Sequence, residues 1–243
     1  MSSEGFAYPG RELEAMAAAS NYHRWILETF RPYLGQHLVE VGAGIGSFSE
    51  LILKHHRCET LSLVEPANGM YDELATRARQ LSSSTRVETY HSTFAKAAPL
   101  IQAAQPPDSI IYVNVLEHIE DDQRELEIIS QTLSEHGRAF VFVPALQWLY
   151  GAFDKRVGHF RRYRKRQLEE KLRRAGFRNV FSTYFDSPGI VPWWVKYCLM
   201  KSVTMSPGSV KLYDQLVVPA TRRIEALVSP PIGKNVIVIA EKR

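Results

Sequence analysis

The sequence predicts an α/β fold: a doubly wound, mostly parallel sheet of seven strands with helices on both faces. Short runs rich in Val, Ile and aromatic residues, typical of buried strands, alternate with stretches of helical periodicity. The length of 243 residues suits one such domain with additions. The composition, 45% hydrophobic and 23% charged, is that of a globular protein.

The predicted elements follow one another in a regular order. Seven segments are interpreted as strands, namely residues 37–44, 60–66, 87–92, 109–116, 138–145, 179–185 and 235–243. Helical patterns cover residues 46–56, 68–82, 119–137 and 165–175. An amphipathic helix within residues 12–35 opens the chain, and Pro32 and Gly35 end it.

Nothing in the sequence predicts a disulfide, a metal site or a membrane span. Cys58 and Cys198 stand far apart and at no metal-ligand spacing, which fits a reducing cytoplasm. His55 and His56 are adjacent and lack an accompanying carboxylate cluster, so no metal is expected. The N-terminus lacks the pattern of a secretory signal, and no apolar run approaches about 18 residues. A cytoplasmic location is therefore expected.

Positive charge is concentrated in one segment. The net charge is +4, yet residues 153–178 hold eleven Lys or Arg against three acids. In the second half of this segment, Glu169 is predicted to pair with Arg173, and Glu170 with Arg174, on a solvated helix face. The first half is predicted to be a loop at a sheet edge.

The segment VEVGAGIGSFSE carries the strongest functional signal. Gly42, Gly44 and Gly46 turn the chain into a helix whose free N–H groups suit a ligand. Glu65 ends the next strand about twenty residues on, where a carboxylate accepts hydrogen bonds from ribose hydroxyls. The spacing differs from the dinucleotide pattern G-x-G-x-x-G, and Glu40 would repel a pyrophosphate but hold a cationic ligand. The pattern therefore points away from NAD and towards S-adenosylmethionine.

Three segments in the expected order, VEVGAGIGSFSE, VEP and NVLEHIEDD, resemble the first three motifs of class I S-adenosylmethionine-dependent methyltransferases. YGAFDKRVGHFRRYRKRQLEEKLRRAGF resembles the corresponding segment of a bacterial small-molecule methyltransferase subgroup. The resemblance covers nearly the whole chain. It implies a Rossmann-like, doubly wound seven-stranded sheet whose last strand is antiparallel. It also implies an enzyme that uses S-adenosylmethionine and releases S-adenosylhomocysteine.

We predict one methyltransferase domain over residues 1–243. Its parts are an N-terminal helical cap (1–35), a cofactor-binding core (36–185), a lid-like insertion (186–234) and the last strand (235–243).

The resemblance also implies which residues bind the cofactor. Glu40 and the backbone of Gly42, Ala43 and Gly44 would hold the methionine part, and Glu65 the ribose. The remaining cofactor contacts are predicted from Pro66 or Ala67, Ser92 or Thr93, Asn114, Val115 and Leu116. Ser92 or Thr93 stands where many relatives place an aspartate at the adenine amine. Tyr22 would either cover the cofactor or belong to the core.

Residues after the fourth and fifth strands are candidates for catalysis and acceptor binding. His118 is a candidate general base, and the strong alternative is that it caps the next helix or lines the cofactor pocket. His159 and Tyr163 are further candidates for catalysis, while Arg161 and Arg162 are candidates to grip an anionic acceptor. Trp193 is a candidate acceptor contact. Arginines that brace the loop against acidic helix ends are the alternative.

The insertion is aromatic and apolar, with scattered Lys and Arg. It is interpreted as a lid over an apolar acceptor, a dimer face, or a peripheral membrane contact through residues 188–217.

The predicted function is methyl transfer to a small molecule, at an oxygen of a natural-product or lipid-linked cell-envelope intermediate. The acceptor is anionic or lipid-like, no nucleic acid is expected, and the chain is a monomer or homodimer. The alternatives are an RNA methyltransferase, a non-catalytic cofactor-binding protein and an NAD-dependent oxidoreductase.

Overall fold

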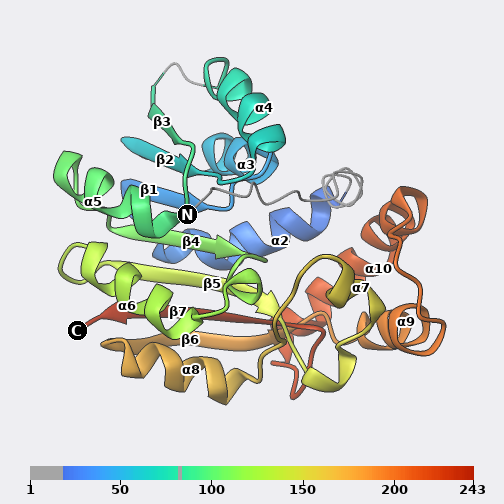
Figure 1. Cartoon of the computed structure of the whole chain (residues 1–243). Helices are drawn as coiled ribbons and strands as arrows, with labels where there is room; N and C mark the ends of the chain where they lie inside the picture. The colour runs from blue at the N-terminus through green and yellow to red at the C-terminus, as the bar shows by residue number, and fades with distance from the viewer. Residues whose placement is uncertain (1–18, 82–83) are drawn as a thin grey trace.

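Seven strands form one sheet in the order β3-β2-β1-β4-β5-β7-β6, as the computed structural model shows for residues 19–81 and 84–243 (Figure 1). The strands are β1 His37–Val41, β2 Thr60–Val64, β3 Arg86–Tyr90, β4 Ser109–Val113, β5 Arg138–Pro144, β6 Phe177–Phe185 and β7 Asn235–Lys242. Strands β1 to β5 are parallel, and β7 runs antiparallel between β5 and β6. The predicted fold class and its antiparallel last strand are confirmed.

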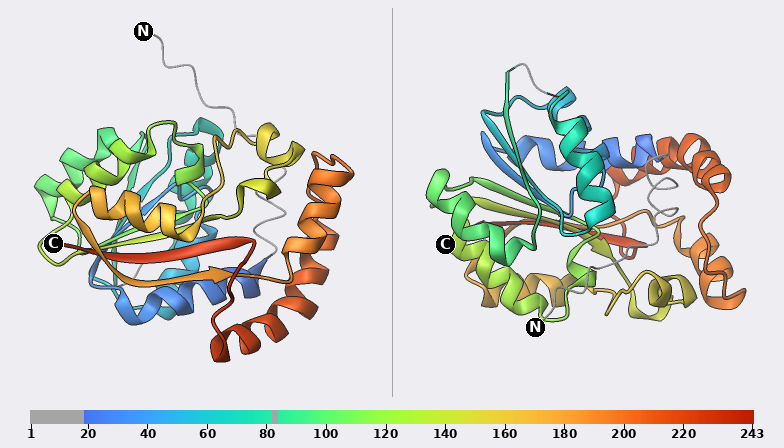
Figure 2. Two further views of the ribbon diagram at one scale, coloured as in Figure 1. Left: turned by 90° about the horizontal axis from the view of Figure 1, so that it is seen from below. Right: turned by 45° about the horizontal axis from the view of Figure 1, so that its top comes forward.

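Helices cover both faces of this sheet (Figures 1 and 2). The longer ones are α2 Ser20–Phe30, α3 Ser47–His55, α4 Asn68–Ala78, α5 Phe94–Ala104, α6 Asp122–Thr132, α8 Lys165–Arg174 and α10 Pro207–Leu227. The shorter ones are α7 Ala152–Arg156, α9 Ile190–Trp193, the 3-10 turns η1 Arg31–Tyr33, η2 Leu116–His118 and η3 Gln147–Leu149, and the π turn η4 Trp194–Leu199. Helix α5 was not predicted, because Pro99 lies inside it and proline normally ends a helix.

Alternation along the strands divides the core into two layers. In β5, Val141 and Val143 face the layer shared with α5, α6 and α8, while Phe140 and Phe142 face the layer shared with α2 and α3. Successive side chains of a strand point to opposite faces, so a strand covered on both sides is apolar throughout. This is why the strands read as continuous hydrophobic runs.

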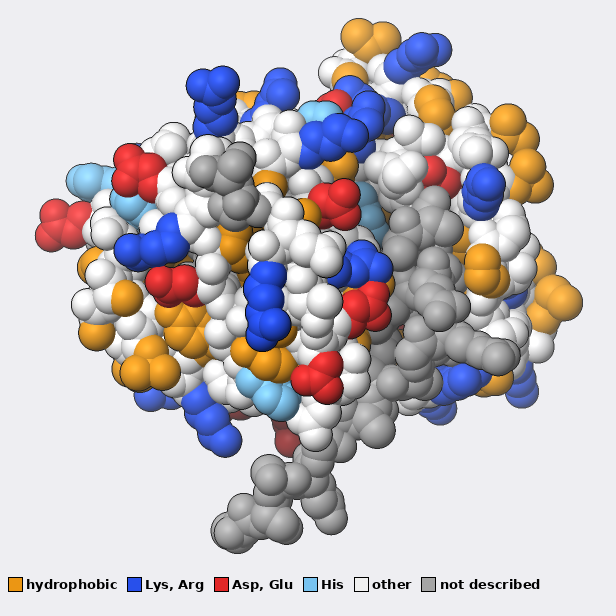
Figure 3. Space-filling model, turned by 90° about the horizontal axis from the view of Figure 1, so that it is seen from above, with side chains coloured by type: hydrophobic (Ala, Val, Ile, Leu, Met, Phe, Trp, Pro, Cys, Tyr) orange, Lys and Arg blue, Asp and Glu red, His pale blue; other side chains and the backbone are white. Residues whose placement is uncertain are grey.

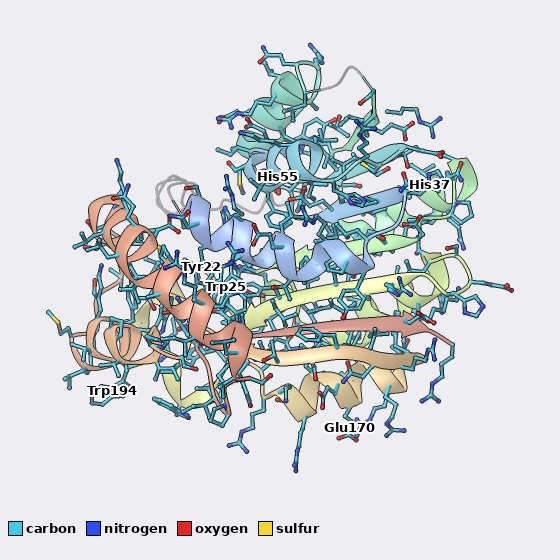
Figure 4. All side chains as sticks on the ribbon, turned by 180° about the vertical axis from the view of Figure 1, so that it is seen from behind. Tyr22, Trp25, His37, His55, Glu170 and Trp194 are labelled. Atoms are coloured by element: carbon cyan, nitrogen blue, oxygen red, sulfur yellow. The ribbon has the colours of Figure 1, made fainter. Side chains whose placement is uncertain are left out.

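The opening helix α2 is fixed by a residue far away in the sequence. The described part of the predicted helix begins at Ser20, and residues 12–18 lie outside the described residues. Its first N–H groups, on Asn21 and Tyr22, donate to the buried carboxylate of Asp214 on α10, at 3.1 and 2.8 Å. Helix α10, the longest helix of the predicted insertion, therefore packs along α2 (Figure 4).

Tyr22 belongs to the core, the second of the two roles predicted for it. Its ring lies edge-on to Phe142 and Phe185, and its hydroxyl donates to Asn235 Oδ1 at 3.0 Å. Figure 4 shows Tyr22 beside Trp25, where α2 meets α10.

We predict that Asp214→Ala lowers the free energy of unfolding by about 1–3 kcal/mol, because two helix N–H groups lose their acceptor. Urea unfolding measures this, with the exposed Asp72→Ala on α4 as control. Equal stability of the two variants would show that Asp214 does not hold α2.

Candidate functional site

The glycine loop after β1 adopts a conformation that needs glycine. Gly42, Gly44 and Gly46 have φ angles of +69°, +58° and +86°, in the left-handed region that side chains disfavour. The N–H groups of Gly42 and Ala43 both donate to Val64 O, at 2.8 and 3.1 Å. A methyl group added to Gly42 would lie 2.4 Å from the Val115 side chain. The loop is thus held between the ends of β2 and β4.

Two buried carboxyl groups flank this loop. Glu40, at the end of β1, accepts a hydrogen bond from Ser49 Oγ at 2.6 Å. Burial raises the pKa of Glu40 to about 8, against the opposing effect of Ser49. Burial also raises the pKa of Glu65, although its carboxyl accepts the N–H groups of Gly44 and Ala67, each at 2.8 Å. Both acids have neutral hydrogen-bond partners, so a cationic ligand beside them would offset their desolvation.

An aromatic pair lies at the ends of β3 and α4. The rings of Tyr71 and His91 stack with centroids 4.3 Å apart and planes 9° apart. Ser92 follows directly and is half-buried, while Pro66 is exposed. Sequence reasoning missed this pair, because only the tertiary structure brings α4 next to the end of β3.

Strand β4 ends in a sharp turn. Asn114 has a φ of +54°, and its N–H donates to Phe142 O at 2.8 Å. This shortens the predicted strand, and the 3-10 turn η2 follows at once. Leu116 is wholly buried in the core, so it shapes the site through its backbone and does not present a side chain to a ligand.

Glu117, His118 and His159 meet beyond this turn; we call them the Glu-His-His cluster. One ligand atom from each lies within 4.8 Å of the other two. The imidazole rings of the two histidines are 4.6 Å apart and edge-on, and His159 Nε2 is 3.8 Å from Glu117 Oε1. Burial raises the pKa of Glu117 to about 7 and lowers the pKa of His118 to about 3.

The carboxylate of Asp154, on α7, orients His159. It accepts His159 Nδ1 at 2.8 Å and the N–H of Gly151 at 2.9 Å. The guanidinium of Arg162 donates to both carboxylate oxygens, at 2.9 and 3.1 Å. Burial alone would raise the pKa of Asp154, but these partners outweigh it and lower the pKa. Because Asp154 is ionised, the proton of a neutral His159 lies on Nδ1, which leaves Nε2 as an acceptor.

Residues 9–181 match the model of a family described as "Methyltransferase domain". The chain belongs to this methyltransferase family. It is a class I enzyme that uses S-adenosylmethionine as its methyl donor. No curated protein sequence matches it.

Solved structures of other methyltransferases share the fold of this methyltransferase. A S-adenosylmethionine-dependent methyltransferase from Archaeoglobus fulgidus is 16% identical with a TM-score of 0.56, covering 90% of this chain and 92% of that one. Phosphoethanolamine N-methyltransferase 2 from Haemonchus contortus is 16% identical with a TM-score of 0.60. The match covers 91% of this chain and 52% of that one. Magnesium protoporphyrin IX methyltransferase from Synechocystis PCC 6803 is 12% identical with a TM-score of 0.52. The match covers 95% of this chain and 81% of that one.

The arginines predicted to grip the acceptor have partners within the methyltransferase itself. Arg162 is buried against Asp154, and its guanidinium also lies 4.6 Å from the Trp193 ring. Arg161 donates to Asp122 at 2.9 Å and to Glu120 O at 2.6 Å. These contacts correct the expectation of an anion grip: both arginines brace the loop, which was the alternative.

Tyr163 and Trp193 also hold the loop in place. The Tyr163 hydroxyl is buried and bonds Asp122 Oδ2 at 2.9 Å and Leu116 O at 3.2 Å; burial and the Asp122 charge raise its pKa. Trp193 Nε1 donates to Leu149 O at 3.2 Å. These contacts give both residues a structural role, while catalysis by Tyr163 and acceptor binding by Trp193 stay predictions.

The basic helix α8 confirms one of its two predicted ion pairs. Arg174 contacts Glu170 at 2.6 Å on the outer side of the helix, where Figure 4 shows Glu170. Glu169 instead accepts from Ser182 Oγ at 2.5 Å and from Asn179, so the predicted pair with Arg173 is wrong. Strand β6, which lies beside α8, supplies these nearer donors.

The insertion exposes apolar side chains along its outer edge. Trp194, Leu199 and Met200 are exposed near Lys201, and Figure 3 shows hydrophobic side chains among basic ones at the right-hand edge of the molecule. Among the described residues, none of the helices combines the length and apolar character needed to cross a bilayer. Whether this edge is a lid, a dimer face or a membrane contact stays a prediction, as does the cytoplasmic location.

We predict that Arg162→Leu lowers the free energy of unfolding by about 3–5 kcal/mol, because it leaves the buried Asp154 charge without its main counter-ion. Arg166→Leu, an exposed change on α8, is the control, and urea unfolding of both variants is the measurement. If Arg162→Leu kept full stability and lost only acceptor affinity, the original anion-grip prediction would be right.

Proposed function

We propose that this methyltransferase transfers the methyl group to an oxygen of a small-molecule acceptor, such as a natural-product or lipid-linked cell-envelope intermediate. The observation that carries the proposal is the Glu-His-His cluster, which follows β4 at the carboxyl edge of the parallel sheet. Open α/β sheets bind their ligands at that edge, where the strand order reverses. Here the order reverses between β1 and β4, beside the glycine loop.

The residues around the glycine loop fit the methyl donor. We assign Glu40, Gly42, Ala43 and Gly44 to its methionine part and Glu65 to its ribose hydroxyls. Buried acids with neutral partners suit a ligand that carries an ammonium and a sulfonium. The adenine end is assigned to Pro66, Ser92 and the Tyr71–His91 pair. Asn114 is assigned to a position beneath the cofactor, with Val115 beside it and against Gly42. Bound S-adenosylmethionine supplies a methyl group on positively charged sulfur.

The cluster supports oxygen as the acceptor atom. A neutral hydroxyl is a poor nucleophile until its proton is removed, whereas a neutral amine already has its lone pair. Asp154 holds His159 so that Nε2 offers a lone pair beside Glu117. His159 Nε2 accepts the hydroxyl proton. The oxygen then forms its bond to the methyl carbon as the carbon–sulfur bond breaks. The bonding pair returns to sulfur, which becomes a neutral thioether.

The distribution of charge supports a small molecule over RNA. Arg161, Arg162, Lys171 and Arg174, all in the basic segment, pair with acids of the protein. Affinity for nucleic acid depends on basic groups that are free to meet phosphates. The segment therefore offers less to RNA than its sequence suggests.

The proposal is tested by incubating the protein and methyl-labelled S-adenosylmethionine with matched panels of hydroxyl compounds and amines and with bulk RNA, and by measuring which acceptors become labelled. We expect label on oxygen, and His159→Asn should lower kcat for the acceptor so found by about 10²–10⁴-fold without weakening cofactor binding. His136→Asn is the control, since His136 is exposed and its φ of +60° suits asparagine. Label on amines or RNA alone would overturn the proposal.

Cofactor binding should release a proton from Glu40. With a pKa of about 8, this carboxyl is mostly protonated at pH 7 in the free protein, and a cationic ligand favours its ionised form. Affinity should therefore rise as pH rises towards 8, by up to roughly tenfold per unit, and then level off. Calorimetry in buffers of different ionisation enthalpy counts the protons released.

Glu40→Gln removes the titrating group and should abolish this dependence. If Glu40→Gln released the same number of protons on cofactor binding as the wild type, the proton would come from another group and the prediction would be wrong. The folded pKa of Glu40 lies above its unfolded value, so the unliganded protein should gain stability as pH falls from 8 towards 4.5.

A further inference from the structure

We propose that Glu117, His118 and His159 bind one divalent transition-metal ion. The three side chains offer a carboxylate oxygen and two imidazole nitrogens within 4.8 Å of one another. The sequence concealed the site, because His159 lies 41 positions from His118 and reaches it only through the fold. The expectation of no metal rested on sequence spacing alone.

The carboxyl group of Glu117 is the independent observation. Glu117 has no exposed surface, and neither carboxyl oxygen has a hydrogen-bond partner in the described parts of the chain. The nearest imidazole nitrogen, His159 Nε2, is 3.8 Å away, which is too far for a hydrogen bond. A buried carboxyl without partners is costly, and a cation among the three ligands would remove that cost.

The surroundings of His159 match those of a metal ligand. Histidines that bind metals commonly donate their other ring N–H to a carboxylate, which fixes the tautomer and the ring. His159 does so through Nδ1 to Asp154, and Arg162 and Gly151 hold that carboxylate in turn. Its Nε2 is thereby directed to the cluster with a free lone pair.

The donor set selects the kind of ion. Two imidazoles and one carboxylate suit Zn²⁺, Mn²⁺, Co²⁺ or Fe²⁺, whereas Mg²⁺ and Ca²⁺ prefer oxygen ligands. Ligand atoms about 2.1 Å from one tetrahedral ion lie about 3.4 Å apart, so the widest spacing in the cluster must contract by up to about 1.4 Å. Three protein ligands leave coordination positions open, as in catalytic metal sites.

The use of this ion in catalysis rests on the proposed function, while the binding site does not. An acceptor hydroxyl in an open position would have its pKa lowered by the ion. With His159 Nε2 bound to the ion, this nitrogen cannot accept the proton, so the O–H bond breaks and the proton passes to water. The oxygen then forms the bond to the methyl carbon as the carbon–sulfur bond breaks towards sulfur. No atom changes its oxidation state in this transfer, so the reaction needs no redox partner.

Cobalt titration of the chelator-treated full-length protein tests the site. We expect one Co²⁺ per chain, visible d–d absorption, and displacement by Zn²⁺. Glu117→Gln and His118→Ala should each weaken binding by at least tenfold, Asp154→Asn by about tenfold, and the control His136→Asn not at all. No binding by the wild type at millimolar Co²⁺, or equal binding by Glu117→Gln, would overturn the proposal.

Thermal unfolding separates a metal ligand from a purely structural residue. Zn²⁺ should raise the Tm of the wild type but not of Glu117→Gln, while without metal Glu117→Gln should be at least as stable as the wild type. A Glu117→Gln that is equally destabilised with and without Zn²⁺ would assign Glu117 a structural role only.

Activity distinguishes this proposal from the proposed function. Oxygen methylation that survives chelation and falls in His159→Asn would support the proposed function and overturn catalysis by the metal. Metal binding together with methylation of amines alone would support the site and overturn the proposed function.

Discussion

Parallel strands that end at one edge of the sheet constrain everything else in this methyltransferase. Because β1 to β5 run in the same direction, the glycine loop, Glu65, Glu117 and His118 all follow strand ends at that edge, and the loop after α7 brings His159 to them. The strand order reverses between β1 and β4. Val115 packs against Gly42 at this point, so the loop after β1 and the turn after β4 are in direct contact.

Buried carboxylates fall into two groups with different consequences. Asp122 and Asp154 have cationic partners, and they fix the loop and helices beyond β5. Glu40 and Glu65 have only neutral hydrogen-bond donors, and Glu117 has none closer than a histidine at 3.8 Å. Breaking either of the two buried ion pairs would leave a charge without a partner, which is strongly destabilising. Glu40, Glu65 and Glu117 lack a cation and keep their affinity for a positively charged ligand at the proposed site.

The contrast explains why the structure gives the basic segment a different role from the one that its sequence predicts. From the sequence, eleven positive charges in 26 residues indicated an anion-binding wall. In the structure, Arg162 and Arg161 pair with acids from α7 and α6, and the segment holds His159 against Glu117. Arg162 thus helps to position His159 through Asp154, while Arg161 ties the same loop to Asp122.

The sequence alone determined the alternation of strands and helices and the glycine loop with Glu40 and Glu65. These features depend on local periodicity, on backbone angles that glycine permits and on short spacings along the chain. Tertiary structure alone decided the partners of long side chains: Asp214 with α2, Asp154 with His159 and Arg162, and Glu169 with Ser182. Burial decided them, because a charged group removed from water takes the nearest suitable partner, which is rarely near in sequence. For the same reason the Glu-His-His cluster exists only in the folded chain.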